Sequence, residues 1–257
     1  MLLSVIVPVY NERHTLGKII VAIGRSLPNV YKEIIVVDDG SRDGTREWLL
    51  ANFPEQERRG ATVDLDCAAN LTFGDVPGAS LITVRCLYHD RNTGKGAAVR
   101  TGFATFTGDI LVIQDSDLEY DPNDLAQMYD LIAVREVADV VFGSRFYGRP
   151  HRSLYFHHYL GNRLISFLFN IAFNQTLTDI EACYKMMTRQ VAQSLRLTAN
   201  DFSIEVEMSA KIARQRKFRI YELGISYYGR TYAQGKKINW KDGIIALWSI
   251  LKFRLFR

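Results

Sequence analysis

Five short apolar runs rich in β-branched residues, most of them followed by a helical pattern, constrain the fold of this chain most strongly. The runs cover residues 2–10, 33–41, 81–88, 109–115 and 138–145. After the first run, Leu16, Ile19 and Ile23 recur at the spacing of one helix face. Strands that alternate with helices predict an α/β fold whose central sheet is mostly parallel and is covered by helices on both faces.

Polar side chains gather where three of these runs end. They are Tyr10, Asn11 and Glu12 after the first run, Asp38 and Asp39 at the end of the second, and Asp115, Asp117 and Glu119 in "QDSDLEYDP" after the fourth. Ligands of parallel α/β sheets bind beyond the carboxyl ends of the strands. Because several converging carboxylates need a cation, the sequence predicts a ligand site that includes one.

The charge of the chain is unevenly distributed. The net charge is only +4, but residues 211–257 contain twelve Lys or Arg and two acidic residues. A basic end on an otherwise acidic chain suggests an anionic partner such as a phosphate or a membrane surface, with a solvated basic helix as the alternative. The basic residues are not interleaved with aromatic residues as a stacking platform, so we expect no nucleic-acid partner.

Cysteine usage and hydropathy indicate the compartment. Cys67, Cys86 and Cys183 are odd in number and lack metal-ligand spacing, which predicts reduced thiols in a cytoplasmic protein. The start, "MLLSVIVPVYNER", reads as a strand because it lacks a basic leader and a small-residue cleavage site. No apolar run approaches the ~20 residues that cross a bilayer. We therefore expect a chain that does not span a membrane, with peripheral contact left open.

Two apolar segments are candidates for that contact. Residues 153–173 are strongly apolar and aromatic, and the tail 240–257 places Ile244 and Trp248 near one helical face before Lys252 and Arg254. This composition suits interfacial helices on anionic lipid, and a helix packed on the sheet or in a subunit interface is the alternative. Residues 54–80 show no clear period and are expected to form an insertion or flexible loop.

Five motifs, in their order and spacing, resemble the family 2 glycosyltransferases of GT-A fold. They are "SVIVPVYNER", "EIIVVDDGSRDGT", "RNTGKGAAVRTGF", "QDSDLEYDP" and "GSR". Within that family the chain is most similar to the branch of dolichyl-phosphate mannose synthase and bacterial polyprenyl-phosphate glycosyltransferases. The resemblance implies one Rossmann-like GT-A domain over 1–257, with a nucleotide-sugar-binding half (1–120), an acceptor-binding half (121–257) and C-terminal helices on the acceptor side.

The resemblance also implies how a donor nucleotide sugar binds. Asp115 and Asp117 match the D-x-D motif that holds Mg²⁺ or Mn²⁺ and the diphosphate, and Glu119 is a candidate third ligand where relatives often have Gln. Such a cation neutralises the charge that develops on the departing diphosphate, which makes Asp117 a catalytic candidate. The other expected nucleotide-binding residues are Pro8, Tyr10 and Glu12 around the base and ribose, Asp38 and chiefly Asp39 at the base, and Lys95 at the phosphates.

On the acceptor side, Arg145, Arg163, Arg230 and Lys236 match basic positions that hold phosphates in the polyprenyl-phosphate branch, with Lys237 an equal candidate for the role of Lys236. The guanidinium group of arginine binds phosphate through two parallel hydrogen bonds. In "TDIEACYK", Asp179 and then Glu181 match the place of an acidic catalytic base. A phosphate acceptor is already ionised and needs no base, so Asp179 has the alternative role of orienting Arg145 or Arg163.

The sequence thus predicts an inverting glycosyltransferase that transfers a sugar from a UDP- or GDP-sugar to a polyprenyl phosphate. One alternative is transfer to a sugar or glycolipid hydroxyl with Asp179 as the base. Another is a nucleotide-sugar-binding module without turnover. The sugar, the base and the oligomeric state are left open, because a carboxylate at Asp39 accepts the ring N–H of uracil and guanine alike.

Overall fold

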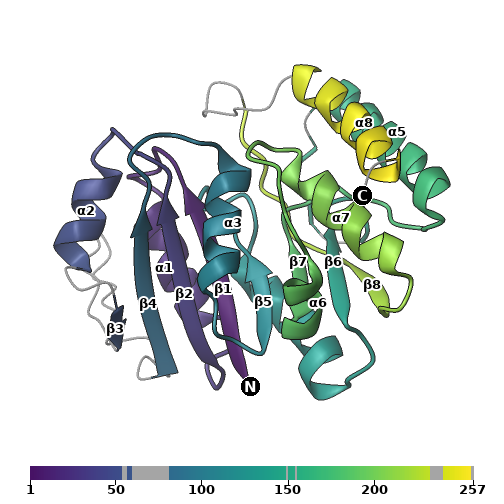
Figure 1. The fold of residues 1–257 in the computed structure, drawn as a ribbon. Helices are drawn as coiled ribbons and strands as arrows, with labels where there is room; N and C mark the ends of the chain where they lie inside the picture. The colour runs from purple at the N-terminus through teal and green to yellow at the C-terminus, as the bar shows by residue number, and fades with distance from the viewer. Residues whose placement is uncertain (54–56, 60–80, 149, 154, 232–239, 256–257) are drawn as a thin grey trace.

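The computed structural model describes residues 1–53, 57–59, 81–148, 150–153, 155–231 and 240–255. Its described strands form one sheet in the order β3-β4-β2-β1-β5-β7-β6-β8 (Figure 1). The strands are Leu2–Val9 (β1), Tyr31–Asp38 (β2), Glu57–Arg59 (β3), Ile82–Tyr88 (β4), Ile110–Ile113 (β5), Val140–Ser144 (β6), Lys185–Thr188 (β7) and Ile220–Gly224 (β8). Only β3 and β7 run antiparallel to the other described strands.

Helices cover both faces of this sheet. They are Leu16–Arg25 (α1), Thr45–Asn52 (α2), Lys95–Thr105 (α3), Leu125–Tyr129 (α4), Phe156–Phe173 (α5), Arg189–Ser194 (α6), Ile204–Gln215 (α7) and Trp240–Leu255 (α8). A 3₁₀ turn at Pro122–Asp124 precedes α4, and a π-helical turn at Asp130–Val134 follows it. The predicted α/β class, with a mostly parallel sheet between two helical layers, is confirmed.

The five predicted strands correspond to β1, β2, β4, β5 and β6. The structure adds β7 and β8 on the far side of β5, where sequence analysis expected no strand. It also adds β3, which lies within the segment 54–80 that was expected to be an insertion or loop. The rest of that segment lies outside the described residues.

Alternation along β1 divides the core between the two faces. Val5 and Val7 pack in one apolar cluster with Ile20 of α1, whereas Ile6 packs in a second cluster with Ala98 of α3. Successive side chains of a strand point to opposite faces, so this central strand must be apolar at nearly every position. Burial of each Val or Ile contributes roughly 1.5–3 kcal/mol before the entropy of ordering the chain is counted.

The same parallel pairing brings the polar segments together. Val9 of β1 pairs with Asp38 of β2, and Ile6 of β1 pairs with Ile113 of β5. The residues that follow these strands therefore meet at one edge of the sheet. Further along, α5 and α8 pack on each other beyond β6 (Figure 1). No helix within the described ranges is both long and apolar enough to cross a membrane.

We predict that Gly102→Ala destabilises the fold. A Cβ atom at Gly102 of α3 would lie 2.6 Å from Cγ2 of Ile6 in β1, so the buried side chain must move. Overpacking of this kind costs about 1–3 kcal/mol in the free energy of unfolding, which urea denaturation measures. The matched control is Gly161→Ala in α5, where a Cβ meets no atom within 4 Å. There alanine stabilises the helix by about 0.5–1 kcal/mol, and a Gly102→Ala protein as stable as the control would contradict the packing.

Candidate active site

A cavity of about 1080 Å³ opens at the carboxyl edge of the sheet. The sequence-predicted residues that line it are Pro8, Tyr10, Glu12, Asp39, Lys95, Asp115, Asp117, Glu119, Arg145 and Arg230. Asp38, Arg163 and Asp179 are not among the lining residues, and Lys236 and Lys237 lie outside the described part of the chain. The structure therefore brings together most of the predicted donor side and two of the predicted acceptor-side arginines.

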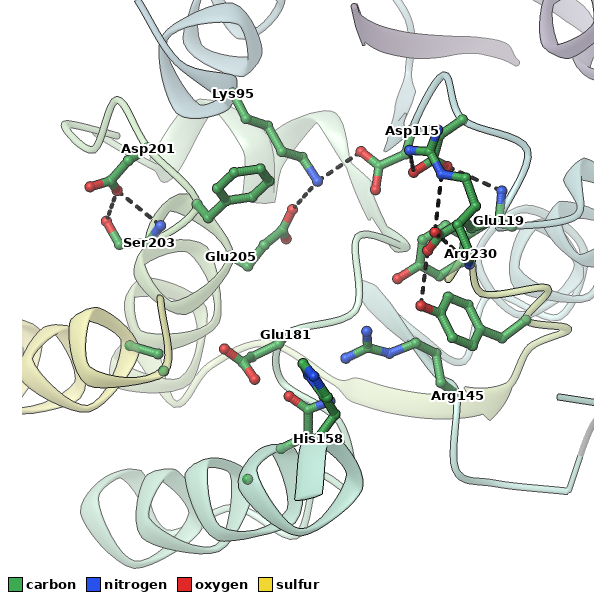
Figure 2. A pocket seen from close by; sticks show the side chains of 18 of the residues that line it. Lys95, Asp115, Glu119, Arg145, His158, Glu181, Asp201, Ser203, Glu205 and Arg230 are labelled. Carbon is green, nitrogen blue, oxygen red and sulfur yellow. Dashed lines mark hydrogen bonds and ion pairs between the residues drawn. The ribbon is translucent and has the colours of Figure 1, made fainter. Parts of the chain in front are cut away.

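Arg230, which follows β8, binds carboxylates that come from the ends of two other strands. Its Nη2 donates to Oδ2 of Asp117 at 2.9 Å, and its backbone N–H donates to Oε1 of Glu119 at 2.9 Å. Its guanidinium also lies 3.3 Å from Glu12, and the hydroxyl of Tyr227 donates to Glu119 at 2.9 Å. One arginine thus partly neutralises three acids (Figure 2).

The acidic cluster keeps a surplus of negative charge. Burial raises the pKa of Asp117 to about 7, Asp115 and Glu119 push it in the same direction, and Arg230 opposes them. Within the described residues no three acidic, His or Cys side chains converge as a complete metal site. Asp115 and Asp117 nevertheless supply two hard oxygen ligands of the kind that Mg²⁺ and Mn²⁺ prefer. They fit a cation whose remaining ligands come from a substrate and water, provided that Lys95 and Arg230 share or release these oxygens.

Lys95 begins a chain of alternating charges behind the cluster. Its Nζ lies 2.7 Å from Oδ1 of Asp115 and 3.0 Å from Oε1 of Glu205 on α7. Oε2 of Glu205 in turn lies 2.7 Å from Nζ of the fully buried Lys185. Burial alone would lower the pKa of Lys95, but the charge of Asp115, together with that of Glu205, outweighs it and raises the pKa well above its ordinary value. Lys95 therefore stays protonated.

Two glycines allow this contact between α3 and α7. Gly94 has a φ of +102°, and a Cβ there would lie 2.3 Å from the carbonyl oxygen of Asn200. A Cβ at Gly96 would lie 2.5 Å from the carbonyl oxygen of Ala199. Only residues without side chains fit at these two positions, so the loop rests directly on the backbone that leads into α7.

Asp39 and Asp38 have different environments although they are adjacent. Asp39 lines the cavity and accepts hydrogen bonds from the backbone N–H groups of Thr93 and Gly94 and from Nδ1–H of His89. Asp38 is fully buried and binds Nε of Arg46 at 2.6 Å. Asp38 therefore stabilises the segment that leads into α2. It does not lie at the surface where sequence analysis expected it to bind the base.

Asp179 is fully buried, and within the described residues Arg145 supplies all the hydrogen bonds that its carboxylate accepts. Its carboxylate accepts from Nε of Arg145 at 2.7 Å, from Nη2 at 2.8 Å and from the backbone N–H of Arg145 at 3.0 Å. Burial alone would raise the pKa of Asp179, but the charge and hydrogen bonds of Arg145 outweigh it and hold the pKa below its ordinary value. This geometry matches the second role that the sequence left open, in which Asp179 orients Arg145. Arg163, on α5, lies with its Nη1 3.5 Å from the carbonyl oxygen of Thr178.

Sequence analysis missed several residues of the cavity wall. Glu205 and Ser203 come from the start of α7, and His158 comes from α5 (Figure 2). Glu181, which sequence analysis named as the second candidate base, precedes β7 and also lines the cavity. Burial raises the pKa of Glu181 to about 7. The available signal was the pattern "IEVEM", in which two acids stand among apolar residues of a helix. Acids in that setting are buried only when they are paired.

The helices α5 and α8 continue the cavity into an apolar surface. His158 and Ile165 of α5 and Ala246 of α8 line the cavity. The two helices expose a set of large apolar side chains, which we call the α5–α8 face. Its members are Phe156, Tyr159, Leu160, Leu164, Phe167, Leu168, Ile171, Ile244, Ile245, Trp248, Leu251 and Leu255. Proteins that expose many large apolar side chains on neighbouring elements commonly use them to contact a membrane or a partner.

Comparison with known proteins gives the family. The sequence model of glycosyl transferase family 2 matches residues 4–66 and 79–196. A dolichol-phosphate mannosyltransferase of Pyrococcus furiosus is 26% identical over 242 residues, which cover 93% of this chain and 61% of that protein. An undecaprenyl-phosphate 4-deoxy-4-formamido-L-arabinose transferase of Yersinia enterocolitica is 28% identical over 195 residues, which cover 75% of this chain and 50% of that protein. The chain thus spans only 50–61% of the length of these relatives.

Solved structures support the fold. Glucosyl-3-phosphoglycerate synthase of Mycobacterium tuberculosis, crystallised with Mn²⁺ and UDP-glucose, superposes with a TM-score of 0.68 over 98% of this chain and 78% of that chain. The sequence identity is 17%, so this likeness concerns the fold alone. Together with the family match it confirms the predicted GT-A fold. The chain belongs to glycosyl transferase family 2.

We predict that Asp179→Asn destabilises the protein at neutral pH. The substitution leaves the buried Arg145 without its counter-ion, and breaking a buried pair on one side costs about 3–5 kcal/mol in the free energy of unfolding. Because the pKa of Asp179 is lowered by folding, its contribution is present above the ordinary value of 3.8 and is lost as pH falls through the folded value. Denaturation curves of wild type and variant should differ at pH 7, and the difference should shrink as pH falls below 3.8 and through the lower folded pKa. Equal stability of wild type and Asp179→Asn at pH 7 would contradict the stabilising role of the ion pair between Asp179 and Arg145.

Proposed function

We propose that this chain is an inverting glycosyltransferase that moves a sugar from a UDP- or GDP-sugar to a polyprenyl phosphate. The observation that carries the proposal is a single cavity that contains the Asp115–Asp117 carboxylates, the Arg145 guanidinium and an exit onto the α5–α8 face. A nucleotide diphosphate, a second phosphate and a lipid chain need these three surfaces side by side.

In the donor half, residues 1–120, Asp115 and Asp117 would hold Mg²⁺ or Mn²⁺, with Glu119 beside them. When bound, this cation neutralises charge on the diphosphate. Pro8, Tyr10 and Asp39 border the end of the cavity that would receive the base and ribose. Lys95, kept protonated by its acidic neighbours, supplies a further positive charge on the phosphate side.

In the acceptor half, residues 121–257, Arg145 would bind the acceptor phosphate. An oxygen of that phosphate attacks the anomeric carbon as the bond from this carbon to the diphosphate breaks, and the nucleoside diphosphate leaves on the opposite face. The acceptor is already ionised at neutral pH, so the step needs no general base. The buried pair of Asp179 and Arg145 suits this chemistry, because it fixes the guanidinium before the substrate arrives.

The names of the relatives and the α5–α8 face support a lipid-linked acceptor and a peripheral position on a membrane, which we place on the cytoplasmic face as part of the proposal. Two of the similar proteins carry dolichol phosphate or undecaprenyl phosphate in their names. Apolar side chains on paired helices with Lys252 and Arg254 nearby match a surface that lies on anionic lipid. Transfer to a hydroxyl with Asp179 as the base has less support, since three groups of Arg145 occupy that carboxylate.

The deciding experiment is transfer from a panel of UDP- and GDP-sugars to a polyprenyl phosphate, with Mn²⁺ and with a chelator. We predict that Asp117→Asn lowers the rate of transfer by at least about 100-fold, because a charge that serves the developing diphosphate is lost. Asp121→Asn, in the same acidic segment but outside the cavity lining, is the control and should keep its rate. Transfer that survives both Asp117→Asn and the chelator would defeat the metal assignment, and absence of transfer by wild type from every donor would defeat the proposed function.

We predict that polar substitutions on the α5–α8 face weaken membrane binding. Ile244 and Trp248 are 56% and 62% exposed. If these side chains insert into lipid, each contributes roughly 1.5–3 kcal/mol of favourable transfer free energy, and replacement by serine removes that contribution. Ile244→Ser with Trp248→Ser should lower the partition coefficient on vesicles of anionic lipid at least tenfold in co-sedimentation. Val134→Ser, which replaces an exposed apolar residue on a different element, is the control. Equal partition of all three proteins would contradict the membrane contact.

A further inference from the structure

Glu181 differs from the other acidic residues that line the cavity. Each of the others binds a described side chain or backbone group: they are Glu12, Asp39, Asp115, Asp117, Glu119, Asp201 and Glu205. Glu181 makes no hydrogen bond and no ion pair with any residue that the structure describes. Its carboxylate nevertheless lines the cavity and is partly buried. A partly buried carboxylate without a partner has lost some of its hydration, so its position suits a ligand that supplies donors.

The position of Glu181 along the cavity limits what that ligand is. Lys95 and Asp115 mark the diphosphate end, and Arg145 marks the acceptor end. Figure 2 shows Glu181 between Arg145 and Glu205, with its carboxylate turned away from the Arg145 guanidinium and with Lys95 beyond Glu205. The sugar is bonded to the diphosphate and is attacked from the acceptor end. It must therefore occupy the space between these ends, which Glu181 borders.

Charge decides between the possible contacts in this space. In its ionised form, the carboxylate of Glu181 would repel both the diphosphate and the acceptor phosphate, so a neutral donor group suits it better than either of them. The hydroxyl groups of a sugar are O–H donors, and the two oxygens of one carboxylate match two neighbouring hydroxyls. Burial raises the pKa of Glu181 to about 7, which is the direction expected for a carboxylate that lacks donors until a ligand arrives.

We propose that Glu181 recognises the transferred sugar by accepting hydrogen bonds from vicinal hydroxyl groups, and that it thereby helps to set the donor-sugar specificity. The inference rests on the proposed function and deepens it. The ligand class is a neutral hexose with a free vicinal diol. Glu181 is then a substrate contact, distinct from the positioning residue Asp179 two places earlier in the chain.

The test compares nucleotide sugars with their parent diphosphates. Isothermal titration in Mn²⁺ would measure Kd for UDP, GDP, UDP-glucose, UDP-galactose, GDP-mannose and GDP-glucose with wild type, Glu181→Ala, Glu181→Gln and the control Glu47→Ala. Glu47 is exposed on α2 and is not among the residues that line the cavity. We expect Glu181→Ala to raise the ratio of Kd for the preferred nucleotide sugar to Kd for its diphosphate about ten- to hundredfold, and to reduce the discrimination between epimers.

The other variants make the outcome specific to Glu181. Glu181→Gln keeps an acceptor oxygen and should change the ratio less than Glu181→Ala does. Glu47→Ala should leave the ratio within twofold of wild type. Binding of the bare diphosphate, which should stay within about twofold in every variant, confirms that each protein is folded at the donor site.

An unchanged ratio in Glu181→Ala would overturn the inference. If both Glu181 variants also lose turnover, the result would instead make Glu181 a base. In either case wild type still binds and transfers, so the proposed function stands. Wild type that binds no nucleotide and no nucleotide sugar would instead defeat the proposed function itself.

Discussion

Pairing of buried charges organises the cavity. Carboxylates that follow β1 and β5 face a lysine at the start of α3 and an arginine after β8. The ion pair between Glu12 and Arg230 joins residues that are 218 positions apart. Loss of one partner of such a pair leaves an uncompensated charge in a poorly solvated place, at a cost of about 3–5 kcal/mol. The walls of the cavity are therefore held in register before any ligand binds, and a ligand with its own charges competes with Lys95 and Arg230 for the same oxygens.

On the acceptor side, a buried ion pair fixes the orientation of one arginine, Arg145. Asp179 takes three hydrogen bonds from Arg145, and Glu222 in turn accepts the backbone N–H groups of Thr178 and Asp179. The guanidinium is thus aimed by groups that are themselves fixed. An arginine that does not have to reorganise when charge moves stabilises a transition state better than a mobile one. A carboxylate that is so fully engaged is poorly suited to take up a proton.

Much of the fold and part of the site could be predicted from the sequence. The apolar runs of β1, β2, β4, β5 and β6 are long or strongly β-branched, and their polar ends mark the binding edge. In contrast, β7 is only the four residues "KMMT", and its strand character comes from pairing with β5 and β6. A motif gives the place of a residue, but it does not give the direction of its side chain. The adjacent Asp38 and Asp39 therefore both fit the pattern, although only Asp39 lines the cavity. Glu205 was missed because its partners Lys95 and Lys185 are distant in sequence.

The two glycines of "TGKG" have a consequence for how the chain tolerates change. The backbone of residues 94–96 lies directly against the backbone of residues 199–200, with no side chain between them. This close backbone packing sets the distance between Lys95 and Glu205. Substitutions among the neighbouring side chains can alter the shape of the cavity without moving this lysine away from its acids. Any side chain at Gly94 or Gly96 would act as a wedge between α3 and α7. The chain therefore tolerates changes among the side chains of its substrate pocket better than it tolerates a side chain at either of these two positions.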